Sequence, residues 1–243
     1  MKAIGTLHGL GVGPGDPELL TLKAVRILGE VDVVFTSAQA PTGKSLALEI
    51  ARPHLRGSQQ IVPIPFSHTF EGVANGEAHR ANAVRVLEVL RRPASAAFLT
   101  LGDPMTYSTF TYLLAALRAE QPDVPIEVVP GITSFAAAAA AAQIPLTEGD
   151  ETLAVVSAAR GAERVEKALG LAENVVVLKS YRHAEEVCRL LEARGLAAST
   201  IYSVACSRPE GFTVQGLDAV PRDANPYMSL FVVKRGGPSA GTR

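Results

Sequence analysis

Three short apolar runs in the first half of the chain each end in a glycine-containing turn that leads into a helical pattern. The runs and their glycines are residues 4–10 with Gly13, residues 95–101 with Gly102, and residues 126–129 with Gly131. Such runs are typical of parallel strands that are covered on both faces. Strands that alternate with helices predict an α/β fold, in which ligands bind beyond the carboxyl ends of the strands. The three turns are therefore candidates for ligand contact.

The turn after residues 95–101 reads Gly102-Asp103-Pro104. Gly102 removes the side chain where the chain leaves the sheet, Asp103 adds a carboxylate there, and Pro104 restricts the backbone. An ordinary connection between a strand and a helix can contain the same three residue types. This turn by itself therefore does not identify a site.

The first turn is rich in glycine but does not match a dinucleotide-binding fingerprint. That fingerprint needs a glycine three residues after Gly13, where this chain has Asp16. Asp16 is suited to cap the following helix and Pro17 to begin it. An acidic side chain at a helix N-terminus repels a pyrophosphate, so a Rossmann site is disfavoured. Either a simple capped turn or close approach of the backbone to a flat or neutral ligand remains open.

Residues 38–45, Ala-Gln-Ala-Pro-Thr-Gly-Lys-Ser, come close to a phosphate-binding P-loop. The first glycine of that motif is replaced by Ala38, and Pro41 lacks a backbone donor that a phosphate would use. We prefer an ordinary turn in which Gly43 breaks the chain and Ser45 begins a helix. A nucleotide hydrolase based on Lys44 is the alternative.

The second half of the chain alternates strands and helices and then changes pattern. The predicted elements are strands 152–157, 174–179 and 199–205, helices 162–170 and 183–194, and two further strands, 212–215 and 228–233, without a helix between them. Two successive strands without a crossover helix imply antiparallel pairing. We therefore expect a mixed sheet in this half.

The length of 243 residues is sufficient for two α/β domains. Pro145 and Gly149 punctuate the segment in which the pattern changes, so we place the boundary there. The predicted organisation is an N-terminal α/β domain over 1–143, a C-terminal mixed α/β domain over 144–235, and a disordered tail over 236–243.

Composition narrows the class of partner. The net charge is −1 and like charges do not form runs, which argues against a nucleic-acid surface. No stretch reaches the roughly 18 apolar residues of a membrane span, and the N-terminus lacks a signal-peptide core. Cys188 and Cys206 have neither metal-binding nor redox spacing. We expect a cytoplasmic protein with a small-molecule partner and no bound metal.

Three motifs in order give a more specific indication. Residues 11–24, the Gly102-Asp103-Pro104 turn and residues 130–134, Pro-Gly-Ile-Thr-Ser, resemble the tetrapyrrole methylases. Enzymes of this family use S-adenosylmethionine in corrin and sirohaem synthesis. The resemblance covers nearly the whole chain and implies two α/β domains with the methyl donor in a cleft between them. It also implies a homodimer.

Within the family, residues 99–110 resemble the branch that methylates position 20 of precorrin-2 or of its cobalt form. The insertion 66–76 and residues 149–155 agree with this branch. Uroporphyrinogen methylases continue after Gly-Asp-Pro with a Phe-Gly-Arg type sequence, where this chain has Thr106-Tyr107-Ser108. The resemblance therefore implies C-20 methylation in cobalamin biosynthesis. Another methylase of the corrin pathway is the alternative within the family.

The resemblance also implies positions that bind S-adenosylmethionine. In the first half these are Pro14, Leu101, Gly102, Asp103, Thr106, Thr133 and Ser134. In the second half, strand order alone aligns Lys179 and the segment Ala205, Cys206 and Ser207 with donor-binding backbone. The acidic substrate also needs hydrogen-bond donors from the protein. Candidates near strand ends are Arg160, Arg182, His183 and Arg208, although each is equally suited to a solvated surface.

Three polar residues are predicted to hold and deprotonate the macrocycle. Asp103 can accept hydrogen bonds from pyrrole nitrogens, Lys179 can pair with a carboxylate, and Tyr227 can donate a hydrogen bond or relay a proton. Because the donor is already electrophilic, neither a metal nor a covalent nucleophile is needed. Two other classes stay open: the nucleotide hydrolase named above, and a carrier that binds a tetrapyrrole without modifying it.

Overall fold

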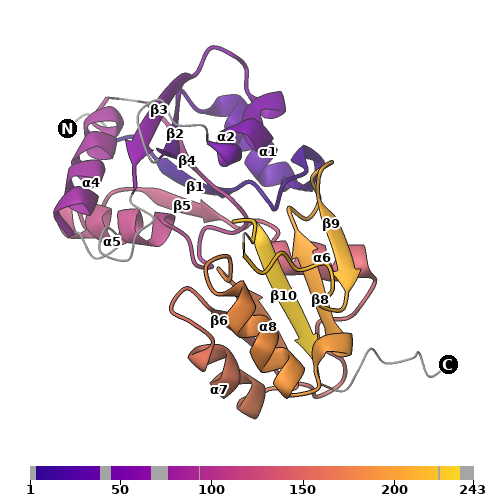
Figure 1. Cartoon of the computed structure of the whole chain (residues 1–243). Coiled ribbons are helices and arrows are strands. Elements are labelled where there is room, and N and C mark those ends of the chain that lie inside the picture. The colour runs from indigo at the N-terminus through magenta and orange to yellow at the C-terminus, as the bar shows by residue number, and fades with distance from the viewer. Residues whose placement is uncertain (1–3, 39–44, 67–75, 93, 224, 236–243) are drawn as a thin grey trace. The chain divides into compact units, whose positions relative to one another are not determined.

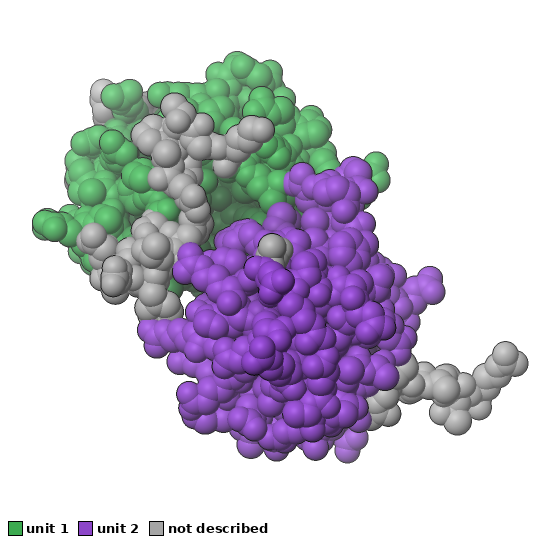
Figure 2. Space-filling model, in the orientation of Figure 1, with its two compact units in different colours: residues 1–133 green, residues 134–243 purple. Residues whose placement is uncertain are grey.

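The computed structural model describes residues 4–38, 45–66, 76–92, 94–223 and 225–235. The chain divides into two compact units, Met1–Thr133 and Ser134–Arg243, which are coloured separately in Figure 2. Each unit contains a five-stranded sheet and its own core. The predicted tail, 236–243, lies outside the described residues.

The sheet of the first unit is entirely parallel, as the sequence predicts. Its strands are β1 (Leu7–Gly11), β2 (Val33–Ala38), β3 (Gln60–Pro65), β4 (Ala96–Thr100) and β5 (Ile126–Val129). They lie in the order β3-β2-β4-β1-β5, and each neighbouring pair runs in the same direction. The carboxyl ends of all five strands therefore lie at one edge of the sheet.

Helices cover both faces of this sheet (Figure 1). They are α1 (Leu22–Glu30), α2 (Leu46–Ala51), α4 (Gly76–Leu90) and α5 (Phe110–Glu120). Apolar residues of α1 and α2 pack with Leu10 and Leu99 on one face, and those of α4 and α5 pack with Leu7 and Phe98 on the other. Burial on both faces explains why these strands are almost continuously apolar.

Asp16 caps a shorter helix than the sequence predicts. Its Oδ1 accepts a hydrogen bond from Glu18 N at 2.8 Å and begins the 3-10 helix Pro17–Leu19. Helix α1 starts afterwards, with Thr21 Oγ1 accepting from Ala24 N at 3.2 Å. Two caps in six residues hold the first glycine turn against its helix.

The second unit has the predicted mixed sheet. Its strands are β6 (Leu153–Ser157), β7 (Asn174–Leu178), β8 (Thr200–Val204), β9 (Phe212–Gln215) and β10 (Ser229–Lys234), in the order β6-β7-β10-β8-β9. Strand β6 is parallel to β7, whereas β10 is antiparallel to both β7 and β8, and β9 is antiparallel to β8. The carboxyl ends of β6, β7 and β8 therefore share one edge with the starts of β9 and β10.

Helices α7 (Glu163–Leu171) and α8 (Ala184–Ala193) pack on one face of this sheet, and α6 (Ser134–Ala142) packs on the other. The sequence analysis assigns α6 to the first domain, whereas the contacts divide the chain between Thr133 and Ser134. The alanines of α6 are small enough to let the helix lie against the sheet, and Ala138 is fully buried beside Val176 and Leu230.

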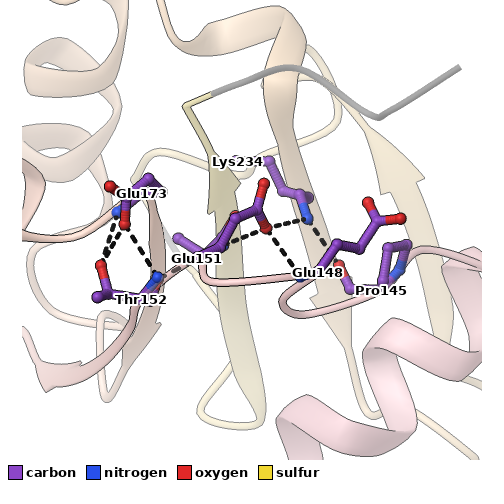
Figure 3. Close-up of polar contacts among 7 residues, drawn as sticks. Pro145, Glu148, Glu151, Thr152, Glu173 and Lys234 are labelled. Atoms are coloured by element: carbon purple, nitrogen blue, oxygen red, sulfur yellow. Dashed lines mark hydrogen bonds and ion pairs between the residues drawn. The ribbon is translucent and has the colours of Figure 1, made fainter.

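A buried lysine anchors the connection between α6 and β6 (Figure 3). Lys234, at the end of β10, is only 2% exposed, and its Nζ lies 3.0 Å from Pro145 O and 3.5 Å from Glu151 Oε2. The same carboxylate oxygen accepts from Asn174 Nδ2 at 2.9 Å and from Glu148 N at 3.0 Å. The hydrogen bond from Asn174, with those from Glu148 and Lys234, lowers the pKa of Glu151.

A second pair lies beside this cluster in Figure 3. Glu173 Oε2 accepts from Thr152 N at 2.9 Å and from the Thr152 hydroxyl. These hydrogen bonds lower the pKa of Glu173 to about 2. Both clusters lie at the edge where β6 and β7 start and β10 ends, opposite to the edge at which β6, β7 and β8 end.

We expect Lys234→Met to lower the free energy of unfolding by about 1 to 3 kcal/mol, because the Pro145 carbonyl and the Glu151 carboxylate lose the charged donor that buried Lys234 supplies. Urea denaturation followed by circular dichroism measures this change. Lys167→Met is the control, since Lys167 pairs with Glu163 at an exposed surface and should change the value by less than about 0.5 kcal/mol. Equal effects of the two substitutions would contradict the anchoring role.

Candidate functional site

The three glycine turns of the first unit meet at the carboxyl edge of its sheet. Strand β1 lies between β4 and β5, so the turns that follow these strands are neighbours in space. Beyond the strands, Gly13 N donates to Gly102 O at 3.2 Å and Gly102 N donates to Gly13 O at 2.8 Å. This reciprocal pair joins two turns that are far apart in the sequence.

Close backbone contact explains two of the glycines at this edge. A Cβ at Gly131 would lie 2.1 Å from Gly102 O, and a Cβ at Gly11 would lie 2.6 Å from both Gly102 O and Gly131 N. Any side chain at either position would therefore force the turns apart. Gly11 and Gly131 are required by packing within the protein.

Gly102 differs from these two glycines. Its φ is +69°, in the left-handed region, and among the described residues a Cβ built on it would come within 4 Å of Ile132 O alone, at 3.9 Å. The space that a side chain would fill at Gly102 is therefore open. Such a position lets a ligand approach the backbone closely.

Asp103 connects the turn after β4 to the turn after β5. Its Oδ1 accepts from Met105 N at 2.9 Å and from Thr106 Oγ1 at 3.2 Å, and its Oδ2 accepts from Gly131 N at 3.1 Å. A carboxylate offers about four acceptor positions, and the chain's own donors take three of them. The residue lies in the predicted site, but its main contacts there position the two turns.

The remaining residues predicted in this unit lie in or beside the same turns. Pro14 is buried, whereas Leu101, Thr106 and Thr133 are half-buried. Tyr107, which was not predicted, is 48% exposed and has a φ of +52°. Left-handed backbone at a non-glycine residue is strained and is found preferentially at functional sites.

The residues predicted in the second unit gather at the edge where β6, β7 and β8 end and β10 begins. Lys179 follows β7, residues 205–207 follow β8, and Tyr227 precedes β10. Arg160, Arg182 and Arg208 belong to the loops at the same edge. Antiparallel β10 brings Tyr227 to this edge, because its start pairs with the ends of β7 and β8.

Backbone strain is concentrated at this edge. Lys179, Ala205 and Ser207 have φ values of 56°, 44° and 65°, and they are three of the five non-glycine residues with positive φ in the described part of the chain. Each such residue costs about 1 to 2 kcal/mol relative to a right-handed conformation. Strain at these positions is consistent with a site, because strained backbone conformations cluster at functional sites.

Cys206 lies between two of these strained residues and is buried. Its Sγ donates to Ser134 O at 3.3 Å, which brings two predicted donor-binding residues together. Ser134 is the first residue of α6. Burial raises the pKa of the Cys206 thiol, so the side chain stays protonated at neutral pH.

Two tyrosines and an arginine form a cluster at the same edge. The rings of Tyr181 and Tyr227 lie 5.2 Å apart at 61°, an edge-to-face arrangement, and the Arg182 guanidinium lies 5.4 Å from the centre of the Tyr181 ring. Desolvation raises the pKa of Tyr227 and lowers that of Lys179. The sequence analysis names Tyr227 as a candidate but not Tyr181, although the Tyr181-Arg182-His183 sequence in the loop after β7 offered a signal.

The features that supported other classes do not form a site in the described residues. Ser45 Oγ accepts from Leu48 N at 3.3 Å and caps α2, as predicted, whereas Gly43 and Lys44 lie outside the described residues. In the described residues, no three His, Cys, Asp or Glu side chains are grouped as metal ligands, and none of the helices is long and apolar enough to cross a membrane.

Comparison with known proteins identifies close relatives by sequence. CobIJ, a cobalamin biosynthesis protein of Mycobacterium tuberculosis, is 36% identical over 97% of this chain and 47% of its own length. The chain thus spans about half the length of that relative. Cobalt-precorrin-2 C(20)-methyltransferase of Salmonella typhimurium is 31% identical, with 95% of this chain and 97% of the relative aligned. Precorrin-2 C(20)-methyltransferase of Sinorhizobium sp is 30% identical, with 95% of each aligned.

Solved structures share the fold. The methyltransferase CobJ superposes with a TM-score of 0.71 at 23% identity, over 98% of this chain and 96% of that one. Uroporphyrin-III C-methyl transferase of Thermus thermophilus, complexed with S-adenyl homocysteine, superposes with a TM-score of 0.67 at 24% identity, over 95% and 97%. The family model for tetrapyrrole (corrin/porphyrin) methylases matches residues 6–217. Because that family model covers most of its length, this chain belongs to the tetrapyrrole methylase family.

Proposed function

We propose that this chain is an S-adenosylmethionine-dependent methyltransferase that methylates C-20 of precorrin-2, or of its cobalt-loaded form, in cobalamin biosynthesis. The observation that carries the proposal is the nearly full-length match to C(20)-methyltransferases of both substrate types. The Thr106-Tyr107-Ser108 sequence after Gly-Asp-Pro supports the same branch. The resemblance is also the basis for proposing a homodimer, whereas the composition of the sequence is the basis for proposing a cytoplasmic location.

The edge of the first sheet fits the methyl donor. Gly102 leaves open the space of one side chain, and its reciprocal hydrogen bonds with Gly13 bring a second backbone segment beside it. Residues that would hold the donor are Pro14, Leu101, Gly102, Asp103, Thr106, Thr133 and Ser134, with Lys179 and residues 205–207 of the second unit. A backbone position that a ligand can approach closely, beside the Asp103 carboxylate, suits a ligand with a flat purine and a positively charged sulfur.

The donor supplies a methyl group on a positively charged sulfur, which keeps the electron pair of the broken bond while C-20 forms the new carbon–carbon bond and loses its proton. The protein must align the reacting atoms and exclude water. It must also accept or relay the C-20 proton. Rigid turns such as those that Asp103 braces are suited to alignment.

Three polar residues are proposed to act on the macrocycle. Tyr227 is protonated at neutral pH, as tyrosines ordinarily are, and desolvation raises its pKa further, so its hydroxyl can donate a hydrogen bond and relay a proton. Lys179 can pair with a substrate carboxylate. Asp103, with three acceptor positions already used, can accept one pyrrole N–H while it braces the turns.

Product analysis tests the proposed function directly. The purified chain is incubated with donor carrying a carbon-13 methyl group and with metal-free or cobalt-loaded precorrin-2, and the product is examined by NMR. We expect the label on C-20. A label on a pyrrole ring carbon would assign the chain to another methylase of the pathway, and binding without transfer would favour a tetrapyrrole carrier.

Substitutions of the polar residues separate proton transfer from binding. Tyr227→Phe should lower kcat by roughly 100-fold if the hydroxyl relays the C-20 proton. Lys179→Met should mainly raise KM for the macrocycle, because it removes a binding contact. Steady-state kinetics at saturating donor measure both effects. Wild-type kinetics in these variants and in Asp103→Asn would mean that catalysis depends on alignment alone.

A pair of glycine substitutions tests the donor site. Gly102→Ala should weaken binding of S-adenosylhomocysteine by about tenfold or more, with a stability loss of about 1 to 2 kcal/mol from its left-handed backbone. Gly131→Ala should instead cost about 3 kcal/mol or more, because its Cβ would lie 2.1 Å from Gly102 O. Calorimetric titration and urea denaturation measure the two quantities. Unchanged affinity in Gly102→Ala would place the donor elsewhere.

A further inference from the structure

The cluster of Tyr181, Arg182 and Tyr227 is more elaborate than methyl transfer requires. A single hydroxyl is enough to relay a proton, yet Tyr227 is paired edge to face with a second ring, which in turn lies beside a guanidinium. Tyr227 is 59% exposed, which is unusual for a large ring held in an aromatic pair. Arg182 is also exposed. These aromatic and cationic groups thus remain accessible to a ligand.

The backbone holds both rings in place. Tyr181 follows Lys179, which has a left-handed conformation, and Ser180, which is fully buried. On the other side, Ser229 Oγ donates to Pro226 O at 2.7 Å, and Ala205 N donates to Met228 O at 2.8 Å, which fixes the start of β10. A platform that is rigid before binding loses little conformational entropy when a ligand arrives.

The chemistry of the cluster selects a flat and acidic ligand. A tyrosine face offers area for stacking, and a guanidinium offers paired donors for a carboxylate. A conjugated macrocycle with acidic side chains presents both features, a broad π-surface and peripheral carboxylates. The overall charge of −1 gives no support to a polyanionic polymer as an alternative ligand.

We propose that the exposed ring of Tyr227, supported edge to face by Tyr181, forms an aromatic platform that stacks on one face of the tetrapyrrole, while Arg182 pairs with one of its carboxylates. This inference rests on the proposed function and deepens it, because it assigns the face of the macrocycle to a ring pair in the second unit. It gives the ring of Tyr227 a role that is separate from its hydroxyl. It also gives Tyr181 a positioning role, because its ring supports that of Tyr227.

Binding of an unreactive macrocycle tests the platform. Uroporphyrin III, which carries eight carboxylates, is titrated into the full chain and followed by fluorescence. Tyr181→Leu and Tyr227→Leu should each weaken its binding about tenfold, whereas Tyr181→Phe and Tyr227→Phe keep the rings and should stay within about twofold of wild type. Arg182→Gln should weaken binding about two- to fivefold and reduce its dependence on salt.

Two controls separate this inference from folding and from the proposed function. Tyr112→Leu removes a half-exposed ring from α5 in the other unit and should leave uroporphyrin binding unchanged. Affinity for S-adenosylhomocysteine, measured on every variant, should be unchanged, and thermal unfolding should shift by no more than about 5 °C, the loss of one ring pair. If the leucine variants bind uroporphyrin as tightly as wild type while methyl transfer to C-20 is intact, the platform is wrong and the proposed function stands. If the wild-type chain binds neither uroporphyrin nor S-adenosylhomocysteine, both are overturned.

Discussion

Direct contact between the backbones of three turns is the constraint on which the first unit depends. Gly11, Gly102 and Gly131 approach so closely that a single Cβ at Gly11 or Gly131 would collide with a neighbouring main chain. Parallel pairing of β1 with β4 and β5 brings these turns to one edge, and the reciprocal hydrogen bonds of Gly13 and Gly102 hold two of them together. Asp103 adds a side-chain brace between the turns after β4 and β5. The edge is therefore rigid before any ligand binds.

The glycines at this edge serve two different purposes: at some positions the protein's own atoms fill the space of a side chain, and at another that space is left open. Gly131 is needed because the protein itself fills the volume, whereas the volume beside Gly102 stays open. Sequence alone marks all of these positions as glycine and cannot tell the two tasks apart, because the difference depends on which atoms lie nearby. The sequence likewise cannot show that Asp103 holds two turns together, because its partner Gly131 is distant in the sequence.

The order of elements and the character of both sheets follow from local pattern. Burial on two faces makes the parallel strands continuously apolar, and the missing helix between β9 and β10 signals antiparallel pairing. The sequence does not indicate which unit α6 belongs to, because its seven alanines form no apolar stripe that would show which sheet the helix covers. Its partners, among them Val176 and Leu230, become evident only from the packing.

The antiparallel direction of β10 explains why Tyr227 and Tyr181 lie at the same edge of the second sheet. If β10 ran parallel to β7, its start would lie with Asn174 at the opposite edge, and Tyr227 would be remote from Tyr181. Because β10 is antiparallel, Leu230 pairs with Leu178, and the residues that flank this pair, Tyr227 before β10 and Tyr181 after β7, come within ring contact. The end of β10 is placed at the other edge by the same reversal, where buried Lys234 secures the connection from α6. Tyr227, just before β10, thus lies at one edge of the sheet, and Lys234, at the end of β10, lies at the other. The proposed contact with the ligand is therefore separate from the anchor of the α6 connection.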